Sequence, residues 1–152
     1  MPLETLLALL STVPSWAVVL YVHIAAASVW LGSAAVNVLG LVPASLRSKD
    51  PLLALQAYKA TMRIQYYSLL LALASGAGVV FYRGLDAYSG DTAVLAGKLI
   101  LGLLAVGLLA WKRQRLGDRL RRGTGVMVFL VLEAITLLVG LLLVMLGVAL
   151  RV

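Results

Sequence analysis

The sequence predicts an all-α protein that crosses a membrane as a four-helix bundle. Of its 152 residues, 62% are hydrophobic and 12% are charged, whereas a soluble domain is nearer half apolar and a quarter charged. Four apolar segments are long enough to cross a bilayer, which takes about 20 helical residues. The basic residues gather in alternate loops between these segments. We therefore expect one transmembrane domain over residues 1–152, with the lipid bilayer as its main solvent.

The four spans are expected, in order, at about 16–42, 62–82, 92–111 and 126–149. The first begins near Trp16 and ends in the region of Pro43, and the third ends at Trp111. The second ends in an aromatic pair, and the fourth is nearly pure Leu, Val and Gly. Because lipid offers no partner to an unpaired backbone group, each span must be a helix.

Two shorter helices are expected outside the spans. Residues 1–14 carry Glu4 and no Lys or Arg, so they lack the basic start of a signal peptide and predict an interfacial helix or a lead-in to the first span. Asp50 followed by Pro51 is typical of a helix start, with the aspartate as cap and the proline in the first turn. This second helix is expected to lie along the interface and to run into the second span.

The distribution of charge predicts the orientation in the membrane. The first and third loops hold most of the cations: Arg47, Lys49, Lys59 and Arg63 in one, and Lys112, Arg113, Arg115, Arg119, Arg121 and Arg122 in the other. The positive-inside rule therefore predicts a multi-pass cell-membrane protein with these two loops in the cytoplasm and both termini outside. This asymmetry accounts for the net charge of +7 and favours contact with anionic lipid over nucleic acid, so no nucleic-acid partner is expected.

Three ionisable residues inside the spans are candidate functional residues: His23, Lys98 and Glu133. His23 and Lys98 each lie six or seven residues from the outer end of a span, roughly 10 Å deep, so they are predicted at one level in the outer half of the membrane. Glu133 is expected in the inner half, where Arg63 is at a suitable depth to pair with it. The absence of cysteine excludes disulfides and thiolate metal sites.

Helical periodicity adds neighbours to these residues. His23, Trp30 and Asn37 are spaced by seven, so they share a face that is predicted to point into the bundle. Similar stripes of small and polar residues follow the other spans, such as Thr61, Gln65, Ser68, Ala72 and Ser75 on the second. Such stripes let helices pack closely or leave room for a flat ligand. Each feature also has a structural interpretation. The histidine would bond a neighbouring helix, Lys98 would extend to the interface, and Glu133 with Arg63 would fix the packing.

The motif His23-x6-Trp30-x-Gly32, taken with GKLILGLLAVGLLAWKR at 97–113, resembles the membrane region of copper-resistance D (CopD-type) proteins and of HemJ-type protoporphyrinogen oxidases. The resemblance implies a small helical bundle whose critical polar pair, here His23 and Lys98, is associated with b-type haem. It gives Lys98 a catalytic role. The WLG sequence is closer to the CopD type, and the arginine that HemJ-type proteins place after the glycine is absent. These departures favour haem binding over oxidase activity.

A neutral imidazole is a good axial ligand for haem iron, and a porphyrin between helices needs an apolar slot lined by small residues. With His23 as metal ligand, the iron would be five-coordinate, or take Lys98 or Met145 as its sixth ligand, or share two His23 residues across a homodimer. Lys98 would otherwise pair with a haem propionate. Trp30 is a further candidate cofactor contact. Copper is less well matched, because Cu(I) favours soft ligands and the chain has one histidine and no cysteine.

Four functions follow as expectations. The first is a haem-b-binding membrane protein that handles electrons. The second is a protoporphyrinogen oxidase that passes electrons to a quinone or another carrier. The third is a copper-handling membrane protein. The fourth is a structural or assembly subunit without a cofactor, in which the polar residues, including Glu133, Arg63 and Asn37, only set the helix register.

Overall fold

The computed structural model describes residues 14–88 and 91–149, apart from the side chain of Asp86, and these residues form helices and no strand. The expected all-α architecture of four helices long and apolar enough to cross a membrane is confirmed. The interfacial helix expected at residues 1–14 falls almost wholly outside the described residues. The helices are α2 (Ser15–Val36), π-helical η1 (Asn37–Leu41), α3 (Val42–Ser48), α4 (Pro51–Arg83), 3-10 η2 (Leu85–Tyr88), α5 (Thr92–Trp111), π-helical η3 (Lys112–Leu116), α6 (Gly117–Arg121) and α7 (Val126–Ala149).

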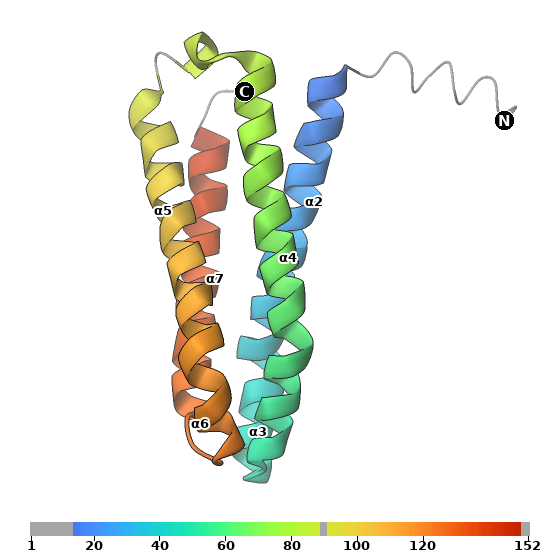
Figure 1. Cartoon of the computed structure of the whole chain (residues 1–152), viewed down its shortest axis with the longest axis vertical. Coiled ribbons are helices and arrows are strands. Elements are labelled where there is room, and N and C mark those ends of the chain that lie inside the picture. The colour runs from blue at the N-terminus through green and yellow to red at the C-terminus, as the bar shows by residue number, and fades with distance from the viewer. Residues whose placement is uncertain (1–13, 89–90, 150–152) are drawn as a thin grey trace, which may run out of the picture.

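The four long helices pack in the cyclic order α2, α4, α5, α7, so α2 and α5 lie on one diagonal and α4 and α7 on the other. The closest pairs are α2 with α4 and α5 with α7 (Figure 1). The start of α2 and the end of α7 lie at one end of the bundle, and α3 and α6 lie at the other. We call the second end the basic end, defined by the cations of α3, η3, α6 and the start of α4.

The first span is longer than the sequence predicts, because the helix continues through the Pro43 region to Ser48. Proline lacks the N–H that would bond the carbonyl four residues earlier, here that of Leu39, and it usually breaks or kinks a helix. The chain instead forms the π-helical turn Asn37–Leu41 directly before α3. This turn shifts the hydrogen-bond register just where the proline has no donor, so the helix continues past it.

The second span and the expected interfacial helix are a single helix, α4, of 33 residues. The predicted start is confirmed: the Asp50 carboxylate accepts a hydrogen bond of 2.9 Å from the Leu52 N–H, and Pro51 occupies the first turn. The expectation that the first part lies along the interface is wrong. Buried Ala54 and Ala57 pack that part into the same core cluster as Val42, Leu116 and Phe129, so it runs along the bundle.

Replacing Asp50 with Ala is expected to lower the free energy of unfolding by about 0.5–2 kcal/mol, because one N–H at the start of α4 loses its acceptor. Thermal unfolding of the purified protein in detergent measures the change. Asp50→Asn is the matched control, since the amide oxygen still accepts the bond. If the two variants were equally destabilised, the cap would not be the cause.

The third span starts at Thr92 and the fourth covers Val126–Ala149, as the sequence predicts, but the third helical segment does not end at Trp111. It continues through the π-helical turn Lys112–Leu116 and α6 to Arg121, where the sequence analysis expects a basic loop. Leu116 and Leu120 explain the extension. They lie four residues apart on one helical face, and both are buried in the core at the basic end.

Candidate functional site

The polar faces that the sequence predicts do point into the bundle. Trp30 and Asn37 on α2 and η1 are buried, and His23 on the same face is half-buried. On α4 the predicted stripe is buried throughout: Thr61, Gln65, Ser68, Ala72 and Ser75. Lipid-facing positions are apolar and exposed, including Leu103 and Met145. The bundle therefore has a polar interior inside an apolar surface.

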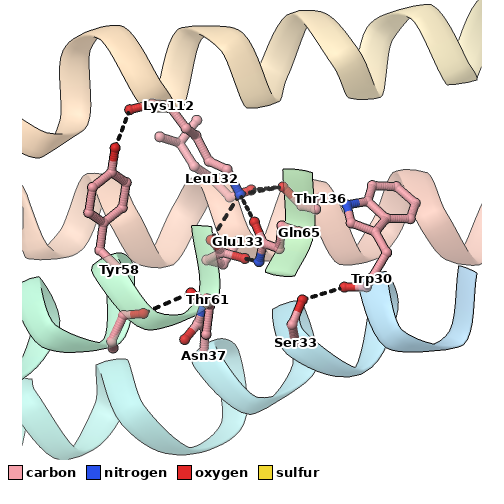
Figure 2. A network of polar contacts seen from close by, with 11 residues as sticks. Trp30, Ser33, Asn37, Tyr58, Thr61, Gln65, Lys112, Leu132, Glu133 and Thr136 are labelled. Carbon is pink, nitrogen blue, oxygen red and sulfur yellow. Dashed lines mark hydrogen bonds and ion pairs between the residues drawn. The ribbon is translucent and has the colours of Figure 1, made fainter. Parts of the chain in front are cut away.

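A buried ion pair occupies the centre of the bundle toward the basic end (Figure 2). The ammonium of Lys112 lies 2.8 Å from Oε1 of Glu133, and both side chains are excluded from solvent. Gln65 of α4 completes the cluster across the bundle. Its amide oxygen accepts a bond of 2.8 Å from Lys112, and its amide nitrogen donates one of 2.8 Å to Oε2 of Glu133. Three helical segments are thus joined by one polar cluster, the Lys112–Glu133–Gln65 cluster.

Every polar side-chain atom of this cluster has a hydrogen-bond partner. Lys112 has three N–H donors, and its third bond, of 3.2 Å, goes to the hydroxyl of Thr136, which in turn donates to the Leu132 carbonyl at 2.8 Å. Both oxygens of Glu133 and both polar atoms of the Gln65 amide are bonded. A lysine and a glutamate together carry no net charge, so the cluster is a neutral unit that the low-dielectric interior tolerates.

The expected pairing of Glu133 with Arg63 is wrong. The side chain of Arg63 is exposed, and the partner of Glu133 is Lys112, which the sequence analysis places in the third loop. The missed signal is the spacing of Lys98, Ala105 and Lys112, which continues one face of α5 by seven residues at a time. A lysine in a run of six cations is readily taken as a solvated residue, and only the continued periodicity marks it as inward-facing.

Two polar atoms of α2 and η1 are buried without a hydrogen-bond partner among the described residues: the Trp30 indole N–H and the Asn37 side-chain oxygen. The amide nitrogen of Asn37 does have a partner, since it donates to the Thr61 hydroxyl at 2.9 Å. Buried polar groups are nearly always bonded, so an unpaired one marks a position where a further polar group fits. Asn37 and Lys112 also begin the two π-helical turns, which occur frequently at functional sites.

His23 lies in the half of the bundle away from the basic end, with its ring against α4. Its Nδ1 is 2.7 Å from the Ala72 carbonyl oxygen. A carbonyl only accepts, so Nδ1 carries a proton, and in the neutral ring Nε2 keeps its lone pair. The ring fits because residue 76 is glycine: a Cβ there would lie 3.0 Å from Cε1 and 3.2 Å from Nδ1 of the histidine. The imidazole is thus held against α4, and its Nε2 makes no hydrogen bond to another described residue.

The other residues predicted for the His23 site lie elsewhere. Lys98 is half-buried on α5, diagonal to α2, and its ammonium is 3.5 Å from the position of a Cβ on Gly147 of α7. No hydrogen bond joins it to His23 in the described part of the chain. Met145 is 69% exposed on the lipid-facing side of α7, so it does not point into the bundle as an axial ligand would. Trp30 is buried between α2 and α7, with its ring against Gly140.

The fold and the site together define the class of protein. It is a four-helix membrane bundle with a buried, charge-neutral polar cluster toward the basic end and, toward the other end, a histidine hydrogen-bonded to a backbone carbonyl. Within residues 14–88 and 91–149, no group of three or more His, Cys, Asp or Glu side chains is arranged to hold a metal ion. No protein-family model matches the chain, and no curated protein or solved structure is significantly similar to it.

Proposed function

We propose that the protein is a membrane haem-b protein that handles electrons, with Nε2 of His23 as the axial ligand of the iron. The observation that carries the proposal is the bond of 2.7 Å between His23 Nδ1 and the Ala72 carbonyl. Metal-ligating histidines almost always donate their other ring N–H to a carbonyl, a carboxylate or water, which fixes the tautomer and makes the ligating nitrogen more basic. The resemblance of the His23-x6-Trp30 motif to haem-associated membrane proteins supports the same assignment.

One residue on the same helical face as His23 would offer a contact to a haem. The Trp30 indole N–H is buried without a partner among the described residues and lies two helical turns from His23 on the same face of α2. A haem propionate is an acceptor that would satisfy it. Haem would supply one-electron chemistry at this position. Met145 does not fit as a sixth ligand, because its side chain faces the lipid. Under the proposal, His23 would hold the iron alone or together with the His23 of a second copy in a homodimer.

Orientation and partners belong to the same proposal. By the positive-inside rule the basic end lies in the cytoplasm, which puts His23 in the outer half of the membrane and both termini outside. A site at that depth exchanges electrons with a carrier in the bilayer, such as a quinone. We also propose Lys98 as a second functional residue, with a role separate from iron ligation because its ammonium lies beside α7 on the far side of the bundle.

The protein purified after expression with haem supplied is expected to show a Soret band that is lost in His23→Ala. Gly76→Ala is the sharper variant, because its added Cβ would displace the ring from the Ala72 carbonyl without removing the ligand. It is expected to shift the band or reduce haem content. Gly32→Ala is its matched control, since a Cβ at position 32 meets nothing within 4 Å.

Absence of the band, or a band unchanged in His23→Ala, would refute haem ligation by this residue. Copper retained in equilibrium dialysis and lost with His23 would instead support the copper-handling function. Rescue of a strain that lacks protoporphyrinogen oxidase would support the oxidase. An unchanged spectrum in Lys98→Met would remove Lys98 from the haem site and leave His23 in place.

The second candidate function is a cofactor-free structural or assembly subunit. One observation favours it: the buried charges of Lys112 and Glu133 are hydrogen-bonded to each other and to Gln65, as expected of a structural cluster. Under this function, the double variant His23→Leu with Lys98→Leu would keep the fold and the binding of its partner proteins. Under the haem function the same variant would lose its cofactor.

A further inference from the structure

Two grooves toward the basic end adjoin each other, since Arg113 and Gln114 line both. The polar groove, of about 170 Å³, lies between the start of α4 and the η3–α6 segment. The apolar groove, of about 550 Å³, lies between α4 and α5. It is lined by Tyr66, Leu69, Leu70, Val106, Leu109 and Ala110, in addition to the two shared residues. The charged polar groove thus lies next to a larger hydrophobic groove.

The polar groove has an excess of positive charge. Lys59, Arg113 and Arg121 line it together with a single anion, Asp118. Its wall is held in place by Tyr58, whose hydroxyl donates to the Lys112 carbonyl at 3.3 Å and whose ring packs edge-on against Phe129. The groove therefore presents fixed cations and a polar wall to a negatively charged group.

Arg113 marks the junction of the two grooves. Its guanidinium lies 5.6 Å from the centre of the Tyr66 ring, which anchors the side chain over α4 by a cation–π contact. The π-helical turn at Lys112–Leu116 determines its position: Lys112 points into the bundle, and Arg113 and Gln114 are left on the outer surface between α4 and α5. The buried cluster and the junction of the grooves are thus built by adjacent residues.

The apolar groove runs in the direction of a lipid tail. Val106 precedes Arg113 by seven residues, so the groove extends about 10 Å along α5, from the basic end toward the middle of the bundle. The surface around it is apolar, with Leu103 73% exposed and Leu104 57% exposed. The cations lie at the basic end, and the apolar lining extends from there toward the bilayer centre. A lipid in the same leaflet has its charged headgroup and its acyl chains in the same order.

We propose that the two grooves form a binding site for one anionic phospholipid of the leaflet that faces the basic end. Its phosphate group lies in the polar groove against Arg113, Arg121 and Lys59, and one acyl chain lies in the apolar groove between α4 and α5. Charge complementarity selects an anionic headgroup, because the groove carries three cations and one anion. The adjoining apolar groove favours a lipid, because a free phosphate has no hydrocarbon chain that could occupy it. The proposal is independent of haem at His23.

The test uses the full-length protein, delipidated in a neutral detergent, with phosphatidylglycerol, phosphatidylcholine and inorganic phosphate as probes. Native mass spectrometry measures bound lipid, and thermal unfolding measures the shift of Tm. Phosphatidylglycerol is expected to bind one per chain and to raise Tm, while the other two probes do not. Arg113→Gln with Arg121→Gln is expected to weaken its apparent affinity roughly tenfold or more, because two charge-assisted contacts are lost.

Two control variants separate the site from general charge and surface effects. Arg115→Gln with Arg122→Gln removes the same charge from exposed positions outside both grooves and is expected to keep the affinity. Ala110→Phe fills the apolar groove without changing charge and is expected to displace the lipid, whereas Leu103→Phe on the outer surface is not. The Ala110→Phe result decides the proposal even if the arginine variant folds poorly.

The following results would overturn it: equal binding of phosphatidylcholine, which would indicate a non-selective annular lipid; displacement of the lipid by inorganic phosphate at similar affinity, which would indicate a soluble ligand; or an equal loss in the two arginine pairs. Dimerisation that is abolished by Ala110→Phe, with no lipid bound, would assign the groove to a second protein helix.

Discussion

Replacing Glu133 with Leu is expected to lower the free energy of unfolding by about 3–5 kcal/mol, because it leaves the Lys112 ammonium buried without a counter-charge. Lys112→Met is expected to lower the free energy of unfolding by a similar amount, because it leaves the Glu133 carboxylate buried without a counter-charge. Gln65 amplifies both effects, since it bonds to both charged partners and loses one bond in either variant. Equilibrium unfolding in mixed micelles, followed by helical circular dichroism, measures the change.

The double variant Lys112→Met with Glu133→Leu is expected to recover most of the loss. Removing both charges leaves no unpaired ion, and replacing a buried ion pair with apolar residues of similar volume is often neutral or stabilising. Arg63→Gln is the matched control. It removes a cation of α4 whose side chain is exposed, two residues before Gln65, and it is expected to change stability by less than about 0.5 kcal/mol. A large effect at Arg63, or additive losses in the double variant, would contradict the assigned pairing.

Replacing Gly140 with Ala is expected to destabilise the bundle by about 1–3 kcal/mol through overpacking between α2 and α7. A Cβ at this position would overlap the Leu31 side chain and lie 3.1 Å from Cζ3 of Trp30. Leu31 can rotate, but the Trp30 ring is buried and has little room to move, so the helices must separate. The same unfolding measurement in micelles quantifies the cost.

Gly107→Ala is the matched control for Gly140, because a Cβ at position 107 meets nothing within 4 Å. There the substitution is expected to be neutral or stabilising by up to about 1 kcal/mol, since alanine favours the helix more than glycine does. Equal destabilisation at positions 107 and 140 would show that loss of glycine itself, and not the contact with Trp30, is responsible.

The fold was predictable from the sequence because lipid restricts the options. A chain with four long apolar segments has only helices with which to satisfy its backbone, and the bounds of α5 and α7 follow directly. The inward faces followed from periodicity, and Trp30, Asn37 and Gln65 are indeed buried. Hydropathy does not predict where the helices end at the basic end. There the polar segment of η3 and α6 continues the third helix, because its one apolar face packs into the core.

The candidate site was predicted less well. His23 is conspicuous as a lone imidazole in a span, but its depth does not show that α2 and α5 lie on a diagonal or that no hydrogen bond joins Lys98 to His23. Lys112 is hard to identify for the opposite reason: it belongs to a run of cations, and only its seven-residue spacing from Ala105 and Lys98 marks it as inward-facing.

The location of the ion pair has a consequence for the order in which the chain is inserted and assembled. Lys112 and Glu133 are only 21 residues apart and belong to one helical hairpin, whereas Gln65 is 47 residues from the lysine and 68 from the glutamate. A charge exposed to hydrocarbon is costly, so the α5–α7 hairpin can neutralise its own two charges as it enters the bilayer, before it meets the first hairpin. Gln65 then acts as the docking contact between two preformed halves, and helix association in lipid is driven by such packing and polar contacts.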